Sequence, residues 1–160
     1  MVTSTRGIAI PLARVTRPLT AAMGELRVSV PTTAPPDVVW PLVRDISART
    51  RFLPKEAFQD VEGDADTARF RVRVAKGWSD AVSRVVRVVE QQEVEERAEG
   101  DGIRYTATFR VEPGALSAVV DYQLAGIPRL LERIMLRPLL LKYFRAGVEQ
   151  LLAEAERRAG

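Results

Sequence analysis

The sequence predicts an α+β protein in which a curved antiparallel sheet of seven strands wraps around one long C-terminal helix. Three observations predict this fold. One strand comes before two short helical runs, six strand-like runs follow with only short turns between them, and the last third of the chain has helical periodicity. Short connections favour antiparallel pairing between neighbouring strands. The broad apolar face of the last helix then has only the open face of the sheet to pack on.

The first elements can be placed from their local signals. The first strand covers Glu25–Val30, where apolar and polar residues alternate, and it breaks at Pro31. Helices are predicted over 37–45 and 46–52. Asp45 lies between them and is expected to cap the second helix, since an aspartate side chain accepts hydrogen bonds from free amides at a helix start.

Six further strands follow, each closed by a turn signal. They span residues 57–62, 67–75, 78–90, 93–99, 103–112 and 115–125. The helical pattern then runs over 128–158. Pro138 interrupts it, because proline has no amide hydrogen to donate, so the sequence predicts either a kink or a separate short helix before the long one.

Composition limits the chemistry that the chain can perform. It has 160 residues, 46% hydrophobic and 28% charged, which is typical of one globular domain. It contains no cysteine and no histidine. Thiolate catalysis, imidazole catalysis and nearly all zinc sites are therefore excluded. We expect no metal and no cofactor, and any proton transfer must use Asp, Glu, Lys, Tyr or water.

The net charge of +3 does not point to nucleic acid. Arg69, Arg71 and Arg73 alternate with apolar residues, which is typical of the solvent face of a strand. We therefore expect no nucleic-acid partner. The oligomeric state stays open.

No apolar run approaches the roughly 20 residues of a membrane-spanning helix. Residues 1–24 have only a broken apolar run and are a poor signal peptide. These features favour a cytoplasmic protein. We expect an N-terminal extension over 1–22, whose role as appendage, lid or upstream start stays open, followed by one ligand-binding domain over 23–160.

Four parts of the sequence together resemble a known superfamily. They are Ala34-Pro35-Pro36-Asp37-Val38-Val39-Trp40 with Asp45, then Phe52-Leu53-Pro54, the strand that begins at Trp78, and Val148–Leu152 in the last helix. Over about residues 25–157 the chain resembles the START/Bet v 1-like (SRPBCC) superfamily with its helix-grip fold, and within it the polyketide cyclase/dehydrase group. The resemblance implies a cavity between the sheet and the last helix that holds a polyketide-, lipid- or quinone-like molecule.

Strand alternation indicates which side chains face this cavity. Phe70 and Val72 point inward from one strand, and Tyr105 and Phe109 from another. In the last strand either face can point inward, and the apolar face with Tyr122 is favoured.

In the strand over 78–90, the face richer in aliphatic residues also carries Asp80 and Arg84. Two alternatives stay open here. Either Arg84 projects into the cavity and donates to a ligand carbonyl, carboxylate or enolate, or Asp80 lies at the rim and a bulge turns Arg84 to the solvent.

The resemblance adds a possible mechanism. In aromatase/cyclase members a cavity arginine follows a tryptophan by six positions on one strand, as Arg84 follows Trp78 here. This implies Arg84 as a carbonyl anchor, with Asp80 or Tyr105 in proton transfer. The chain departs from those enzymes at Phe58, where they tend to have a tyrosine, so a binding protein without catalysis fits equally well.

The candidate residues fall into two sets. The candidate catalytic set is Arg84, Asp80 and Tyr105. The candidate ligand-binding set is Phe58, Phe70, Val72, Trp78, Val82, Phe109, Tyr122, Leu141, Tyr143 and Phe144.

Overall fold

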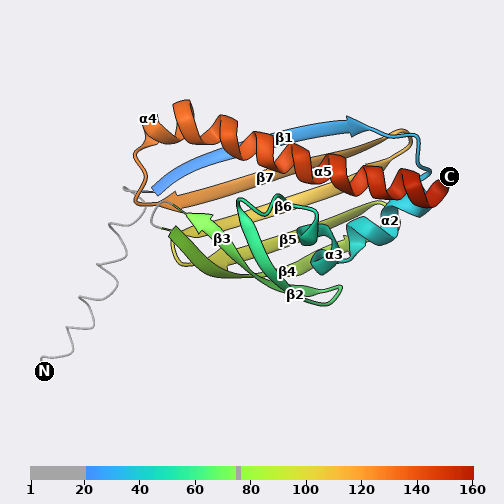
Figure 1. The fold of residues 1–160 in the computed structure, drawn as a ribbon, viewed down its shortest axis with the longest axis horizontal. Coiled ribbons are helices and arrows are strands. Elements are labelled where there is room, and N and C mark those ends of the chain that lie inside the picture. Colours follow the sequence, from blue (N-terminus) through green and yellow to red (C-terminus); the bar gives the residue numbers. More distant parts are fainter. Residues whose placement is uncertain (1–20, 75–76) are drawn as a thin grey trace, which may run out of the picture.

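The computed structural model describes residues 21–74 and 77–160, and it confirms the predicted α+β architecture (Figure 1). Seven strands form one antiparallel sheet in the order β1-β7-β6-β5-β4-β3-β2. Each strand from β2 to β7 pairs with its neighbour in the sequence, and β1 closes the far edge by pairing with β7. The strands are β1 Ala21–Pro31, β2 Phe58–Gly63, β3 Thr67–Val74, β4 Gly77–Val89, β5 Glu93–Gly100, β6 Ile103–Glu112 and β7 Ala115–Ala125.

The helices cover the inner face of this sheet. They are α2 Pro36–Arg44, α3 Ile46–Arg51, α4 Arg129–Leu131, the π-helical turn η1 Glu132–Leu136, and α5 Arg137–Ala159. In Figure 1, α5 lies along β1 and β7, with α2 beside its C-terminal end and α4 at the opposite end. The short helix α3 packs on β2 and β3.

The last two residues of the predicted N-terminal extension, 21 and 22, belong to the first strand of the sheet. β1 begins at Ala21, which pairs with Ala125 of β7. Residues 1–20 lie outside the described part of the chain, so an extension over those residues stays a prediction.

The hinge between β1 and the two short helices follows from its sequence. Pro36 occupies the first turn of α2, where the missing amide hydrogen is not needed. The Asp45 carboxylate accepts from the amides of Ser47 at 3.0 Å and Ala48 at 3.1 Å, which confirms it as the cap of α3.

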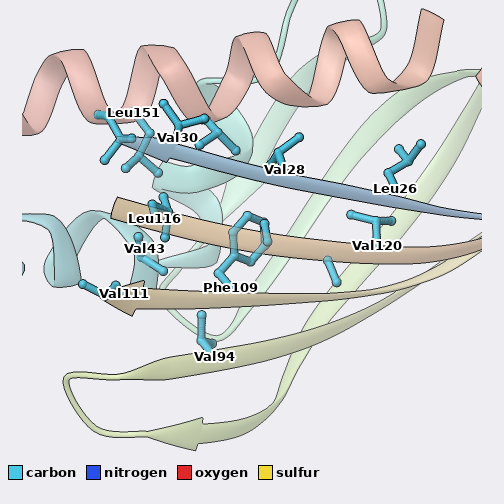
Figure 2. Close-up of a cluster of buried hydrophobic side chains, with 14 of the residues drawn as sticks. Leu26, Val28, Val30, Val43, Val94, Phe109, Val111, Leu116, Val120 and Leu151 are labelled. Atoms are coloured by element: carbon cyan, nitrogen blue, oxygen red, sulfur yellow. The ribbon is translucent and has the colours of Figure 1, made fainter. Parts of the chain in front are cut away.

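The main hydrophobic core lies between α5 and the inner face of β1, β7 and β6, and α2 also contributes to it (Figure 2). The alternating residues Leu26, Val28 and Val30 of β1 point toward α5. Val30 is paired with Leu116 of β7, and Leu116 and Leu151 of α5 in the same core are 0% and 1% exposed. Burial of these side chains fixes the register of the sheet, because a one-residue slip would turn each of them outward.

The long helix α5 is buried unequally along its length. In its second half Gly147, Val148, Leu151, Leu152 and Ala155 are buried. A Cβ atom at Gly147 would lie 2.7 Å from Leu53 Cδ2, so the helix approaches the α3–β2 connection closely there. In its first half the apolar side chains of Leu140, Leu141, Tyr143 and Phe144 are only half-buried.

The interruption predicted at Pro138 takes the form of the π-helical turn η1. Pro138 lies in the first turn of α5, and the Arg137 amide bonds back five residues to the Glu132 carbonyl. Extra-wide turns of this kind are found mostly as single turns within helices, often at functional sites.

Candidate functional site

The face of β4 predicted to point inward is the outer face, and that prediction is wrong. Asp80 and Arg84 are exposed, whereas Ser79, Ala81 and Ser83 are buried. The bulge in β4 lies beyond these residues and plays no part in their orientation. Arg84 therefore cannot anchor a ligand in the interior, and Asp80 cannot transfer a proton there.

Trp78 and Val82 lie on the same outer face as Arg84, so they also leave the predicted ligand-binding set. The guanidinium groups of Arg71 and Arg73 lie 5.5 Å and 5.8 Å from the centroid of the Trp78 ring. Cross-strand arginines thus cover the indole with their stems and charges. Counting apolar residues on each face of β4 therefore predicts the wrong inner face, because the solvent face also carries apolar side chains, such as Trp78, that neighbouring arginines cover.

The interior instead contains a buried ion pair that the sequence analysis did not find. Arg49 of α3 and Glu96 of β5 are 5% and 3% exposed, and the Arg49 guanidinium donates to Glu96 Oε1 and to the Val43 carbonyl. Ser83 Oγ donates to Glu96 Oε2 at 2.5 Å. We call Arg49, Glu96, Ser83 and the neighbouring Tyr105 the buried polar group. The side chains of Arg49 and Glu96 fill the space next to the inner face of β4, which explains why that face carries small residues.

Arg49 has one further donor. Its Nε atom is buried, and no hydrogen-bond partner for it exists within 21–74 and 77–160. The Arg49 guanidinium carbon lies 4.4 Å from the centroid of the Phe109 ring, which is a cation–π contact. A buried donor without a partner costs about 1–3 kcal/mol, so such groups are uncommon unless they have a use.

Tyr105 brings a hydroxyl to the same place. Burial raises the pKa of Tyr105 well above its usual value, and the negative charge of Glu96 raises it further, against an opposing effect of Arg49. The hydroxyl therefore keeps its proton at neutral pH and serves as a hydrogen-bond donor rather than a base. The structure thus places Tyr105 beside a buried charge pair, as the only member of the candidate catalytic set on the inner face.

Most of the predicted ligand-binding residues do face inward. Phe70, Val72, Phe109 and Tyr122 are buried, and Phe58, Leu141 and Phe144 pack against the buried core clusters. The rings of Phe109 and Phe144 meet edge to face with centroids 5.9 Å apart. Tyr143 is half-buried on the same helix.

Two hollows adjoin these elements. One, of about 390 Å³, lies between α3 and β2 and is lined by Thr50, Leu53, Phe58 and Val61 among others. The other, of about 510 Å³, is lined by the outward residues Glu25, Arg104 and Asp121 and also by the inward residues Tyr105 and Tyr122, together with Arg137. The second hollow therefore reaches Tyr105 of the buried polar group, whereas no member of that group lines the first.

A second polar cluster ties the π-helical turn to the sheet. The Tyr122 hydroxyl donates to Glu132, and Arg137 donates to the same carboxylate at 2.8 Å and 2.9 Å. Tyr122 reaches Glu132 across Gly24, where a Cβ atom would lie 2.3 Å from the tyrosine oxygen. We call Tyr122, Glu132 and Arg137 the latch. It holds the beginning of the helical segment on the open end of the grip.

The latch predicts a pH-dependent stability. Desolvation raises the pKa of Glu132, but the hydrogen bonds from Arg137 and Tyr122 outweigh it, so the pKa is lowered in the folded protein. The unfolded chain, with a glutamate pKa of about 4.3, then binds more protons than the folded chain, and stability falls as the pH drops below that value. Glu132→Gln should flatten this acid limb in urea unfolding measured from about pH 3 to pH 7. Parallel curves for the two proteins would contradict the role of Glu132.

Arg49, Glu96 and Glu132 were missed for different reasons. Glu96 has a readable signal, because alternation puts it on one strand face with Val94 and Ala98, both buried. Arg49 lies on a helix of six residues, too short for a periodicity to separate its faces. Glu132 is surrounded in sequence by arginines, which favours a solvated interpretation.

The described residues contain neither a candidate metal site nor a candidate membrane-spanning helix. No group of three or more Asp and Glu side chains gathers there in a way that could hold a metal ion. In the same part of the chain, no helix has both the length and the apolarity needed to cross a membrane.

The family profile described as polyketide cyclase/dehydrase and lipid transport matches residues 23–156. The chain belongs to this family. The resemblance drawn from the sequence to the polyketide cyclase/dehydrase group of the START/Bet v 1-like superfamily is confirmed. Membership of the polyketide cyclase/dehydrase family supports a role in binding a hydrophobic ligand. No curated protein sequence matches the chain.

Solved structures agree with the fold of the family. The Zhui aromatase/cyclase from Streptomyces sp. R1128 is 19% identical with a TM-score of 0.63, over 86% of this chain and 96% of that one. Norcoclaurine synthase from Thalictrum flavum is 13% identical with a TM-score of 0.61, over 88% and 90%. A protein from Chromobacterium violaceum is 22% identical with a TM-score of 0.58, over 83% and 98%. At these identities the likeness establishes the fold.

Proposed function

We propose that the chain binds a hydrophobic small molecule with an oxygen-bearing end, polyketide-, lipid- or quinone-like, between the sheet and the first half of α5. The buried polar group holds the oxygen-bearing end. The observation that carries this proposal is the buried charged pair of Arg49 and Glu96, with Arg49 Nε free to donate.

Incomplete burial of side chains in the first half of α5 supports a binding position for such a molecule there. Leu140, Leu141 and Phe144 face the main core but are only half-buried, unlike the residues one and two turns later. A ligand in this region would complete their burial and gain the hydrophobic free energy that the half-buried side chains leave unused.

The polar end of the ligand is argued from charge and donors. A carbonyl or carboxylate oxygen accepts from a guanidinium N–H and from a phenol hydroxyl, and Arg49 and Tyr105 supply these donors. Glu96 and Ser83 position the guanidinium by hydrogen bonding. A pure hydrocarbon would leave the Arg49 donor unsatisfied, so ligands with an oxygen are favoured.

Binding can be tested with a panel and one conservative variant. Native mass spectrometry of the purified full chain should detect a co-purifying apolar molecule. Titration calorimetry with a long-chain fatty acid, a short-chain ubiquinone and an anthraquinone should identify a binding class. Tyr105→Phe should then weaken that binding roughly threefold to tenfold, the effect of one lost hydrogen bond.

Arg84→Ala is the matched control for Tyr105→Phe. It removes an exposed arginine on the opposite face of the sheet, so affinity should not change. The proposal fails if no member of the panel binds, or if Arg84→Ala weakens binding and Tyr105→Phe does not.

A second candidate function is proton transfer to a bound carbonyl compound, as in a cyclase or dehydratase. The buried hydroxyl of Tyr105 next to Glu96 favours it, because a protonated phenol can donate to a developing enolate. The two structural neighbours named as an aromatase/cyclase and as norcoclaurine synthase support it by analogy. Chromatography with mass analysis of a β-ketone substrate after incubation distinguishes the two. A binding protein returns the substrate unchanged, a dehydratase product has lost one water, and a cyclised isomer of the same mass elutes differently.

A further inference from the structure

The beginning of the C-terminal helical segment has its apolar side chains on the side that faces solvent. Leu130, Ile134 and Met135 are 65%, 62% and 66% exposed, and Leu131 and Leu139 are exposed as well. Side chains four positions apart lie on one helix face, so these five residues form two adjacent rows. We call them the outer strip. The row that faces the protein consists of Glu132, Leu136 and Leu140.

This arrangement is the reverse of an ordinary surface helix, which turns its apolar face inward. Elsewhere α5 follows the ordinary pattern, with Val148, Leu151 and Leu152 buried. The outer strip is therefore a local feature of α4, η1 and the first turn of α5. Contiguous exposed apolar side chains of this kind mark interaction sites.

The charge around the outer strip is strongly positive. Residues 129–145 contain five basic side chains and one acidic one. The basic residues are Arg129, Arg133, Arg137, Lys142 and Arg145. The acidic one, Glu132, is buried and bonded to Arg137, so it presents no negative charge to a partner.

We propose that the outer strip docks on the surface of an anionic lipid bilayer. The helical segment lies in the plane of the interface, with its leucine, isoleucine and methionine side chains at the acyl boundary. The flanking arginines lie at the anionic headgroups, as in other interfacial amphipathic helices. This docking is independent of which molecule the interior binds.

Charge complementarity favours a bilayer over the other possible occupants. A second copy in a symmetric contact would bring one basic strip against another, and like charges oppose such a contact. Residues 1–20 contain Arg6, Arg14 and Arg17 and no acidic residue, so this segment carries the same sign as the strip. A bilayer supplies negative charge and apolar depth, and it needs no groove to receive the convex helix.

The test is cosedimentation of the full chain with phospholipid vesicles. The protein should bind vesicles in which about a third of the lipid is phosphatidylserine, and bind pure phosphatidylcholine vesicles far more weakly. Raising NaCl to about 0.5 M should release the protein from the vesicles, because the Debye length then falls to about 5 Å and the attraction between the arginines and the anionic headgroups is screened. Ile134→Gln/Met135→Gln should reduce binding by roughly tenfold or more, because two apolar side chains no longer enter the interface.

Two further variants make the result specific. Arg129→Gln/Arg133→Gln should weaken binding to the anionic vesicles while leaving the thermal midpoint unchanged, since both side chains are exposed. Val86→Gln is the matched control, because Val86 is 47% exposed on β4, away from the strip, and binding should not change.

Three outcomes overturn the proposal. The first is equal binding to neutral and anionic vesicles, and the second is no binding to either. The third is a dimer in sedimentation velocity that Ile134→Gln/Met135→Gln dissociates without any vesicle binding, which would assign the strip to a second copy.

Discussion

Replacing Glu96 by leucine is expected to lower the free energy of unfolding by about 3–5 kcal/mol, because it leaves the Arg49 charge buried without its partner. Arg49 and Glu96 side chains are 5% and 4% exposed, so water cannot replace the lost interaction. Ser83 Oγ loses its acceptor as well. Urea unfolding at neutral pH measures the change.

The double variant Arg49→Met/Glu96→Leu should recover most of the lost stability, since apolar side chains of similar volume often replace a buried ion pair without loss. The two single variants and the double variant form a cycle that isolates the coupling between the two charges. The control is Asp66→Asn in the exposed pair with Arg44, where the expected change is about 0–1 kcal/mol. A loss below about 1 kcal/mol for Glu96→Leu would show that the pair is not desolvated as its burial implies.

The double variant also separates stability from function. If the pair exists to hold a ligand, Arg49→Met/Glu96→Leu should be folded and stable yet unable to bind the oxygenated ligand that the wild-type protein binds. If the double variant binds as well as the wild type, the buried polar group has no part in recognition. Retention of a buried ion pair is weak evidence for stability, so a functional reason is the one worth testing.

The fold could be predicted from sequence because its signals are local. Turn residues such as Gly63, Gly102 and Gly114 close their strands, and these glycines have positive φ angles that side chains rarely adopt. The hinge with Pro36 and Asp45 fixes the start of both short helices. Strand order then follows from short connections.

The site could not be predicted to the same extent, because its residues meet only in the folded chain. Arg49 and Glu96 are 47 positions apart and bond across two different elements. On β4 the charge of Arg84 suggested a functional role, but the residues of β4 that face the interior are the small Ser79, Ala81 and Ser83. Ser83 faces inward through strand alternation, and a larger side chain there would take the space of the ion pair. The polarity of one residue on a strand therefore predicts a functional site less well than the space around that residue in the folded protein.

Replacing Leu151 by alanine is expected to lower the free energy of unfolding by about 2–5 kcal/mol, the range for a leucine removed from a packed core. Leu151 is 1% exposed and lies in the cluster where α5 meets β1 and β7 (Figure 2). The matched control is Leu139→Ala in the same helix. Leu139 is 40% exposed, so its truncation should change stability by less than about 0.5 kcal/mol. Urea unfolding of both variants measures the difference.

The contrast between Leu151 and Leu139 bears on how a ligand enters. The second half of α5 fixes the helix to the core, and the first half is attached mainly through the latch and half-buried side chains. Amides over 147–155 should therefore exchange hydrogen only through global unfolding, and amides over 132–141 through smaller local openings. Leu151→Ala should speed exchange throughout, whereas Glu132→Gln should speed it only in the first half. Equal protection along the whole of α5 would contradict an opening at this end and would require ligand entry elsewhere, for example beside Phe58 at the hollow between α3 and β2.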